Sequence, residues 1–167
     1  MKGALAALLF LSAACAPRKS VAPPAERHAG ESRSDDPAIT LERTSCFGRC
    51  PVYRLSISSN GLVSYHGVAN VRQLGDAAGQ IPAERVAHLL QELEEAGYFL
   101  FASRYTPADS TCGRYATDLP TAITSVSLKG RRKRIEHDQG CGAAPGALRV
   151  LEHRIDEVAQ SSRWTGH

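Results

Sequence analysis

The side chains best suited to chemistry in this sequence are its five cysteines, Cys15, Cys46, Cys50, Cys112 and Cys141. A cysteine can attack a disulfide as a thiolate, bind zinc, carry a lipid or pair with a second cysteine. An odd number leaves one thiol without a partner in an oxidising compartment, so one of the five is expected to have a separate fate. Cys15 is the candidate, because it ends an apolar N-terminal segment.

Residues 1–15, MKGALAALLFLSAAC, follow the order of a secretory signal peptide. Lys2 supplies the positive charge, an apolar run follows, and small residues precede Cys15. The apolar run is about half of the ~20 residues that a membrane-spanning helix needs, so we expect no retained span. The N-terminus therefore predicts export.

The placement of Cys15 directly after two alanines resembles the lipobox of bacterial lipoproteins, in which the cysteine is acylated and becomes the new N-terminus. The resemblance implies a signal peptide at residues 1–14 and an acyl anchor that holds Cys15 in the lipid bilayer. Ala16 resembles the sorting residue of outer-membrane lipoproteins, which implies a place in the cell envelope, at the outer membrane facing the periplasm. Ser12 stands where the lipobox usually has leucine, which leaves cleavage after Ala14 and a soluble periplasmic or secreted protein as the alternative.

Residues 16–37 have the composition of a spacer. They contain four prolines and balanced charges, and Val21 is their only large aliphatic residue. Such a segment cannot bury enough apolar surface to offset the entropy lost on ordering. Together with the lipidated Cys15 it predicts a disordered tether over residues 15–37, which as a flexible coil spans ~25 Å on average.

Residues 38–167 are long enough for one domain, which at this size buries roughly two-thirds of its unfolded surface. Apolar and polar residues alternate in two segments, Ile39–Thr44 and Tyr53–Ser58, and predict two half-buried strands. Asn60-Gly61 tolerates the positive φ angles of a tight primed turn, so a hairpin to a third strand at residues 62–67 is expected.

In the second half, Pro82 begins a predicted helix that Gly97 ends, with one apolar stripe between them. Residues 98–101, Tyr-Phe-Leu-Phe, are expected to enter the core. The remaining predicted elements are two strands and a last helix, at 122–128, 132–138 and from Pro145 onward. The order βββ-α-ββ-α predicts an α+β fold: an antiparallel sheet of about five strands with two helices packed on one face.

The string Cys46-Phe47-Gly48-Arg49-Cys50-Pro51-Val52-Tyr53 joins the first two predicted strands. It resembles a family of uncharacterised bacterial exported domains, a domain of unknown function with a Cys-Phe-Gly-x-Cys-Pro-x-Tyr signature. The resemblance extends over residues 39–164, through the Asn-Gly hairpin to three further stretches, Asp118-Leu119-Pro120, Ile155–Glu157 and Arg163-Trp164. It implies one domain and no assigned activity.

Four cysteines of the domain allow three disulfide pairings, and geometry favours one of them. Cys46 and Cys50 flank a three-residue turn, whereas Cys112 and Cys141 lie in two loops that antiparallel strands bring to the same end of the sheet. A bridge between the latter two encloses about 30 residues and stabilises the domain by about 3–4 kcal/mol. Zinc ligation and thiol-redox chemistry by the first pair are the alternatives, although thioredoxin-type motifs have two intervening residues at a helix N-terminus.

Two polar segments are candidates for binding. The loop at residues 102–121 is long for a compact domain, and such loops are often functional. It offers mixed aromatic and hydrogen-bonding groups for a binding surface, at Tyr105, Asp109, Arg114, Tyr115 and Asp118. The alternative is an idle loop fastened by Cys112, in which Asp118 only begins a turn.

The second segment is a basic patch, Arg131, Arg132, Lys133 and Arg134, within the last predicted strand. Its functional interpretation is attraction to anionic lipid headgroups, cell-wall polymers or an acidic partner. The alternative interpretation is a strand whose charges prevent its exposed edge from pairing with other chains.

The sequence contains no phosphate loop, no Gly-x-Ser-x-Gly motif and no nucleophile–base pair, and its six histidines lack metal-ligand spacing. We therefore expect no enzyme activity, cofactor or metal, and with a formal charge of only +3 no nucleic-acid partner. The leading hypothesis is a non-catalytic cell-envelope lipoprotein domain that binds a protein or an envelope component such as the cell wall. The alternatives are an exported enzyme inhibitor and a thiol-redox or metal-binding protein that uses Cys46 and Cys50.

Overall fold

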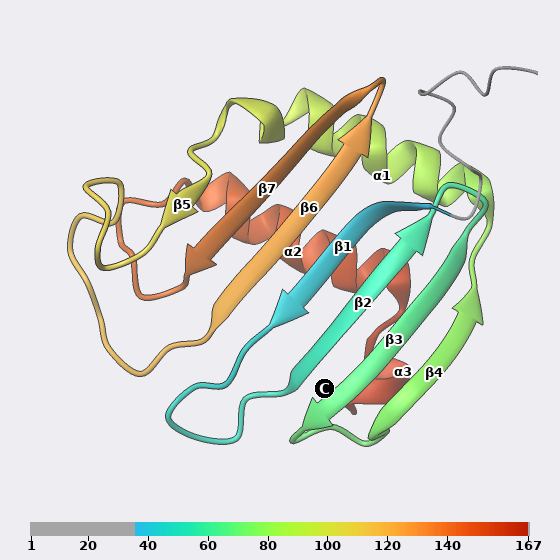
Figure 1. Ribbon diagram of the computed structural model, residues 1–167, viewed down its shortest axis with the longest axis horizontal. Coiled ribbons are helices and arrows are strands. Elements are labelled where there is room, and N and C mark those ends of the chain that lie inside the picture. The colour runs from blue at the N-terminus through green and yellow to red at the C-terminus, as the bar shows by residue number, and fades with distance from the viewer. Residues whose placement is uncertain (1–35, 167) are drawn as a thin grey trace, which may run out of the picture.

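The computed structural model describes residues 36–166, which form one mixed sheet with helices on a single face (Figure 1). The strand order is β4-β3-β2-β1-β6-β7-β5. The expected signal peptide, the lipid on Cys15 and the tether up to residue 35 lie outside the described residues. The elements are β1 (Pro37–Arg43), β2 (Val52–Ser58), β3 (Leu62–Ala69), β4 (Gly75–Gln80), α1 (Ala83–Glu95), the 3-10 turn η1 (Tyr98–Leu100), β5 (Arg104–Tyr105), β6 (Thr121–Leu128), β7 (Arg131–Asp138), α2 (Gly146–Ala159) and α3 (Ser162–Thr165).

The α+β class is confirmed, but the sheet has seven strands rather than about five. The strand β4, with the sequence GDAAGQ, contains no β-branched or aromatic residue, and its regular antiparallel pairing with β3 alone makes it a strand. The two-residue β5 runs parallel to β7, so the expectation of a wholly antiparallel sheet was wrong at this edge. Both additions depend on a neighbouring strand and not on local sequence preference.

The hairpin between β2 and β3 has a three-residue loop. Gly61 donates its N–H to the carbonyl of Ser58 at 2.9 Å and takes a φ of +87°, which favours glycine. Asn60 does not adopt a positive φ, so the primed two-residue turn expected from Asn-Gly was wrong. Its side-chain oxygen instead accepts the N–H of Leu62 at 3.1 Å.

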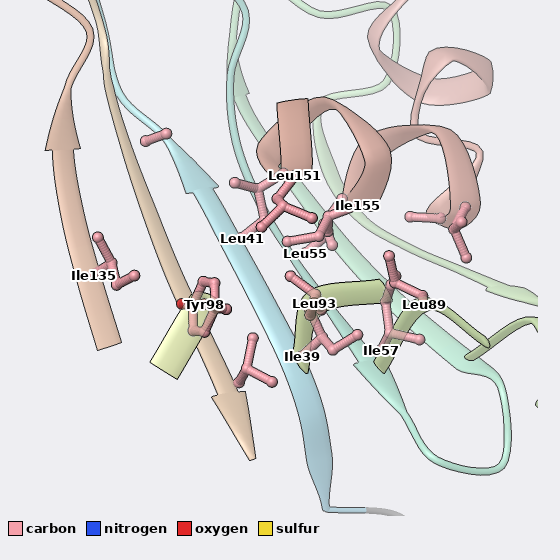
Figure 2. Packing of buried hydrophobic residues seen from close by; sticks show 14 of the residues in the cluster. Ile39, Leu41, Leu55, Ile57, Leu89, Leu93, Tyr98, Ile135, Leu151 and Ile155 are labelled. Atoms are coloured by element: carbon pink, nitrogen blue, oxygen red, sulfur yellow. The ribbon is translucent and has the colours of Figure 1, made fainter. Parts of the chain in front are cut away.

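The core lies between the sheet and the helices α1 and α2 (Figure 2). Apolar residues at every second position of β1 and β2 meet the stripes of both helices, and the fully buried members include Ile39, Leu41, Ile57, Leu89, Leu93 and Ile155. Tyr98 is also completely buried, and its hydroxyl hydrogen-bonds the Thr124 hydroxyl at 2.7 Å. Leu100 is 88% exposed, so the expectation that all of residues 98–101 enter the core was wrong.

The opposite face of the sheet is covered by no helix among residues 36–166, and it is the face turned toward the viewer in Figure 1. Its strands present Ser, Thr, Arg, Glu and His side chains at the positions that alternate with the core residues. Within the same described range, no helix is both long and apolar enough to cross a membrane.

Candidate functional site

Two loops meet at one end of the sheet. The first, residues 44–51, connects the end of β1 to the start of β2, and the second, residues 106–120, leads from β5 into β6 (Figure 1). Because β1, β2 and β6 are antiparallel neighbours, the end of β1 lies beside the starts of the other two. We call these two loops the braced end.

A disulfide stabilises each loop of the braced end. Cys46 is bonded to Cys50 with a Cα–Cα distance of 5.7 Å, and Cys112 is bonded to Cys141 at 4.4 Å. This is the pairing that the spacing favours. The two disulfides indicate an oxidising, exported location. Bonded cysteines offer no thiolate to a metal, and residues 36–166 contain no cluster of three or more His, Cys, Asp or Glu side chains suited to a metal ion.

Hydrogen bonds join the two loops to each other. The Phe47 N–H donates to the carbonyl of Asp118 at 3.1 Å, and at the base of the first loop the Thr44 N–H donates to the carbonyl of Thr121, the first residue of β6, at 3.0 Å. Gly48, inside the smaller disulfide loop, has a φ of +148°, a conformation that L side chains rarely adopt. The smaller loop is thus held at its base, across its middle and by a covalent bridge.

This rigid loop presents an apolar ring to solvent. The Phe47 side chain is 88% exposed. Leu119 is 46% exposed and follows Asp118, the residue whose carbonyl accepts the Phe47 N–H. Core packing does not explain a phenylalanine in this position, because the ring contributes nothing to the buried cluster. Exposed apolar residues that gather in one place mark interaction surfaces, and Phe47 and Leu119 lie on loops that a backbone hydrogen bond joins.

Beneath the smaller loop lies a network of polar side chains. Asp156 on α2 accepts hydrogen bonds from the Arg43 Nε atom at 2.8 Å, the Tyr53 hydroxyl at 2.5 Å and the Ser161 hydroxyl at 2.8 Å. The Arg43 Nη2 atom lies 2.7 Å from the same carboxylate, off the direction of a hydrogen bond, so this contact is electrostatic. Burial raises the pKa of the Tyr53 hydroxyl, and the Asp156 charge raises it further.

The profile of a family described as Domain of unknown function (DUF6438) matches residues 37–159, from β1 to the end of α2. The chain belongs to the DUF6438 family. The expectation of a domain of unknown function is thereby confirmed, and no curated protein matches the chain.

Aromatic side chains of the domain hold its C-terminal residues against the sheet. Tyr53 lies against Tyr65 with a centroid distance of 5.6 Å, and Tyr65 stacks on Trp164 at 4.8 Å. The Arg163 guanidinium lies 3.9 Å from the centroid of the Trp164 ring. Together with the carboxylate of Asp156, these contacts give Tyr53 and Trp164 a structural role, in contrast to Phe47.

Two of the five residues expected in the binding loop are structural in the DUF6438 domain. Tyr105 is 5% exposed, and its ring packs edge-on to His137 with centroids 6.1 Å apart. Asp109 pairs with Arg104 at 3.3 Å and, through backbone hydrogen bonds, lies within the turn that leads to Cys112. Neither side chain points freely to solvent.

The other three, Arg114, Tyr115 and Asp118, are exposed at the braced end. The Tyr115 hydroxyl donates to Asp138 at 3.2 Å, and the Asp118 backbone has a φ of +71° while its carbonyl accepts the Phe47 N–H. The length and composition of the loop predicted a binding role for these residues, whereas no sequence pattern predicted the exposure of Phe47. The only hint of this exposure in the sequence is that an apolar residue stands between two cysteines of one loop.

The four basic residues of β7 do not form one patch, because successive side chains of a strand point to opposite faces. Arg131 lies over the Phe99 ring at 4.3 Å and pairs with Glu94 on the helix side, the side that Lys133 shares by its register. Arg132 and Arg134 lie on the open face. The interpretation as a single basic patch was therefore wrong.

Since β5 pairs only with Glu136 and His137, the basic part of β7 is an edge in the described sheet, where such charges oppose pairing with other chains.

We expect Asp156→Ala to lower the free energy of unfolding by about 2–3 kcal/mol, because it leaves the half-buried Arg43 without its counter-charge and removes the acceptor of three donors. Urea denaturation at pH 7 measures the change. Glu157→Ala is the matched control, since the next side chain on the same helix is 66% exposed. Equal effects of the two substitutions would show that the network contributes little.

Proposed function

We propose that the chain is a non-catalytic cell-envelope lipoprotein whose DUF6438 domain binds a partner protein through the braced end. In this proposal Cys15 carries the acyl anchor, and the residues between it and β1, which begins at Pro37, space the domain from the membrane. The observation that supports binding is the 88% exposure of Phe47 on a disulfide-closed loop. The two disulfides support an exported setting.

The physical case rests on preorganisation. Binding usually costs the entropy of ordering flexible loops, and a loop that is already bridged and hydrogen-bonded avoids much of that cost. Aromatic side chains are frequent binding hot spots because one ring buries a large apolar area in a pocket of the partner. Phe47 is the anchor in this proposal, Leu119 extends the apolar centre, and Arg114 and Tyr115 supply a polar rim.

The test introduces the photo-crosslinker benzoylphenylalanine at Leu119 in the full chain, expressed in its own cells. We expect one defined crosslinked product, whose yield falls at least tenfold when Phe47→Ala is added. Leu100→Ala is the matched control, because Leu100 is equally exposed at 88% but lies on η1, outside the braced end. The absence of a defined product, or equal yields with Phe47→Ala and Leu100→Ala, would contradict the proposal.

The anchor is tested in the same cells with Cys15→Ser. We expect this variant to leave the membrane fraction while the purified domain keeps its unfolding midpoint, because Cys15 lies outside the domain. Retention of Cys15→Ser in the membrane fraction would refute the lipid anchor without bearing on Phe47.

An exported enzyme inhibitor is the second candidate, and the protruding, disulfide-closed Phe47 loop favours it. Such a loop can enter a partner's cleft in a fixed conformation. Mass spectrometry of the crosslinked product identifies the partner. An enzyme that loses activity on adding wild-type protein, but not Phe47→Ala, would favour inhibition over simple docking.

A further inference from the structure

The open face of the sheet carries a continuous row of hydroxyl groups. Ser64 on β3 is paired in register with Ser56 on β2, which pairs with Thr40 on β1, which pairs with Ser125 on β6. Directly opposite Ser125 on β7 is Arg134. The hydroxyl row crosses four strands, and Arg134 continues it onto a fifth, a total length of about 19 Å at the usual strand spacing.

A second row of longer side chains runs beside it, two residues away along each strand. In order of pairing it consists of Asp76, His66, Arg54 and Glu42. Because the hydroxyl residues are short and these side chains are long, the hydroxyl row becomes the floor of a groove. Its volume is about 500 Å³, and Arg132 and Arg134 line its end on β7.

The two ends of this groove differ in charge. Arg132 makes one long contact, with the Ser125 hydroxyl at 3.5 Å, among the described residues, and Arg134 makes a long, exposed contact with Glu136 at 3.4 Å. Neither guanidinium is saturated, and in residues 36–166 Arg54 forms no ion pair with a carboxylate. The other end of the groove is different, since His66 there already pairs with Asp76 through Nδ1 and Oδ1. The groove thus offers guanidinium groups to an anion at its β7 end and hydroxyl groups along its floor.

We propose that this groove binds an acidic glycan. Arg132 and Arg134 hold a carboxylate of the glycan, and the hydroxyl row forms hydrogen bonds with its sugar hydroxyls or amides. Guanidinium groups bind carboxylates through paired, charge-assisted hydrogen bonds, which ammonium groups cannot match in geometry. This site is separate from the braced end and does not depend on Phe47.

Three features favour a glycan over other anionic partners. The floor is built from hydroxyl groups, which match the hydroxyls and amides of a sugar, whereas many peptide-binding grooves add apolar pockets for side-chain anchors. The groove is long compared with a lipid headgroup. Two carboxylates that line the groove, Asp76 and Glu42, disfavour a chain that is uniformly anionic, so the ligand alternates acidic and neutral units or carries its charge at one end.

The experiment uses isothermal titration calorimetry with the full chain in detergent. The probe is hyaluronan hexasaccharide, in which glucuronate alternates with a neutral acetamido sugar. Chitohexaose is the neutral counterpart, and hexaglutamate is an anionic peptide without hydroxyl groups. We expect hyaluronan hexasaccharide to bind at least tenfold more tightly than either. Absence of binding, or equal binding of chitohexaose or hexaglutamate, would overturn the proposal.

Variants then locate the site. The double variant Arg132→Ala/Arg134→Ala should weaken the binding of hyaluronan hexasaccharide at least tenfold, whereas Arg85→Ala, an exposed arginine on α1, should leave it unchanged. Thr40→Val, which keeps the side-chain shape and removes one floor hydroxyl, should weaken binding about fivefold. Phe47→Ala should bind the probe like the wild type, so failure of the braced-end proposal is distinguishable from failure of this one. Unchanged binding in the arginine double variant would place the glycan elsewhere.

Discussion

Replacing Glu152 by alanine is expected to lower the free energy of unfolding by about 3–5 kcal/mol. Glu152 on α2 and His137 on β7 are each 1% exposed, and the Oε1 atom of the first lies 2.7 Å from the Nδ1 atom of the second. Without the carboxylate, the imidazole remains buried with neither ring nitrogen paired, since Nε2 has no hydrogen-bond partner in the described part of the chain. Burial of an uncompensated polar ring is the source of the cost.

Two companion variants separate charge from shape. Glu152→Gln keeps the volume and one hydrogen-bond acceptor, so we expect a smaller loss than with alanine. His153→Ala changes the next residue of the helix, which is exposed, and is expected to alter stability by less than about 0.5 kcal/mol. Urea denaturation at pH 7 with intact disulfides measures all three. A loss below about 1 kcal/mol for Glu152→Ala would mean that water or a rearranged side chain satisfies the imidazole.

Removing the larger disulfide with Cys112→Ser/Cys141→Ser is expected to cost about 3–4 kcal/mol. The bridge joins residues 29 positions apart, and cross-linking a loop of that length removes substantial entropy from the unfolded chain. Both cysteines are also buried, at 3% and 1% exposure, so the serine hydroxyls enter an apolar site. Urea denaturation under non-reducing conditions measures the loss.

The smaller disulfide provides the comparison. Cys46→Ser/Cys50→Ser opens a loop with a separation of only 4, for which the same entropic relation gives about 2 kcal/mol. Removing the smaller disulfide should also reduce the yield of the Leu119 crosslink, because Phe47 loses its preorganised position. Greater destabilisation by the smaller pair than by the larger would contradict the assignment of rigidity to one bridge and global stability to the other.

These effects matter because a domain of this kind is stabilised by only about 5–15 kcal/mol. Loss of the His137–Glu152 pair together with the larger bridge therefore endangers folding. Both features lie where the end of β7, the loop around Cys112 and α2 meet. The second loop of the braced end is positioned by this cluster.

The sequence by itself determined the features that a few neighbouring residues encode. Alternation at every second position places Ile39 and Leu41 in a strand, and the apolar stripe between Pro82 and Gly97 makes a helix, because these periods match the backbone geometry of each element. The same local order, with the loop lengths it implies, led to the observed cysteine pairs and to the DUF6438 domain.

Only the tertiary structure decided which distant residues became neighbours. The strand β4 forms because β3 supplies its hydrogen bonds, and no preference of Gly, Ala, Asp or Gln for strands could have indicated it. Strand pairing also separated Arg131 from Arg132 onto opposite faces, brought Glu152 against His137 and left Phe47 exposed. The hydroxyl row needs four strands in one register, whereas each of its members alone is an ordinary polar residue. Such contacts depend on pairing and packing across the whole chain, which local periodicity does not specify.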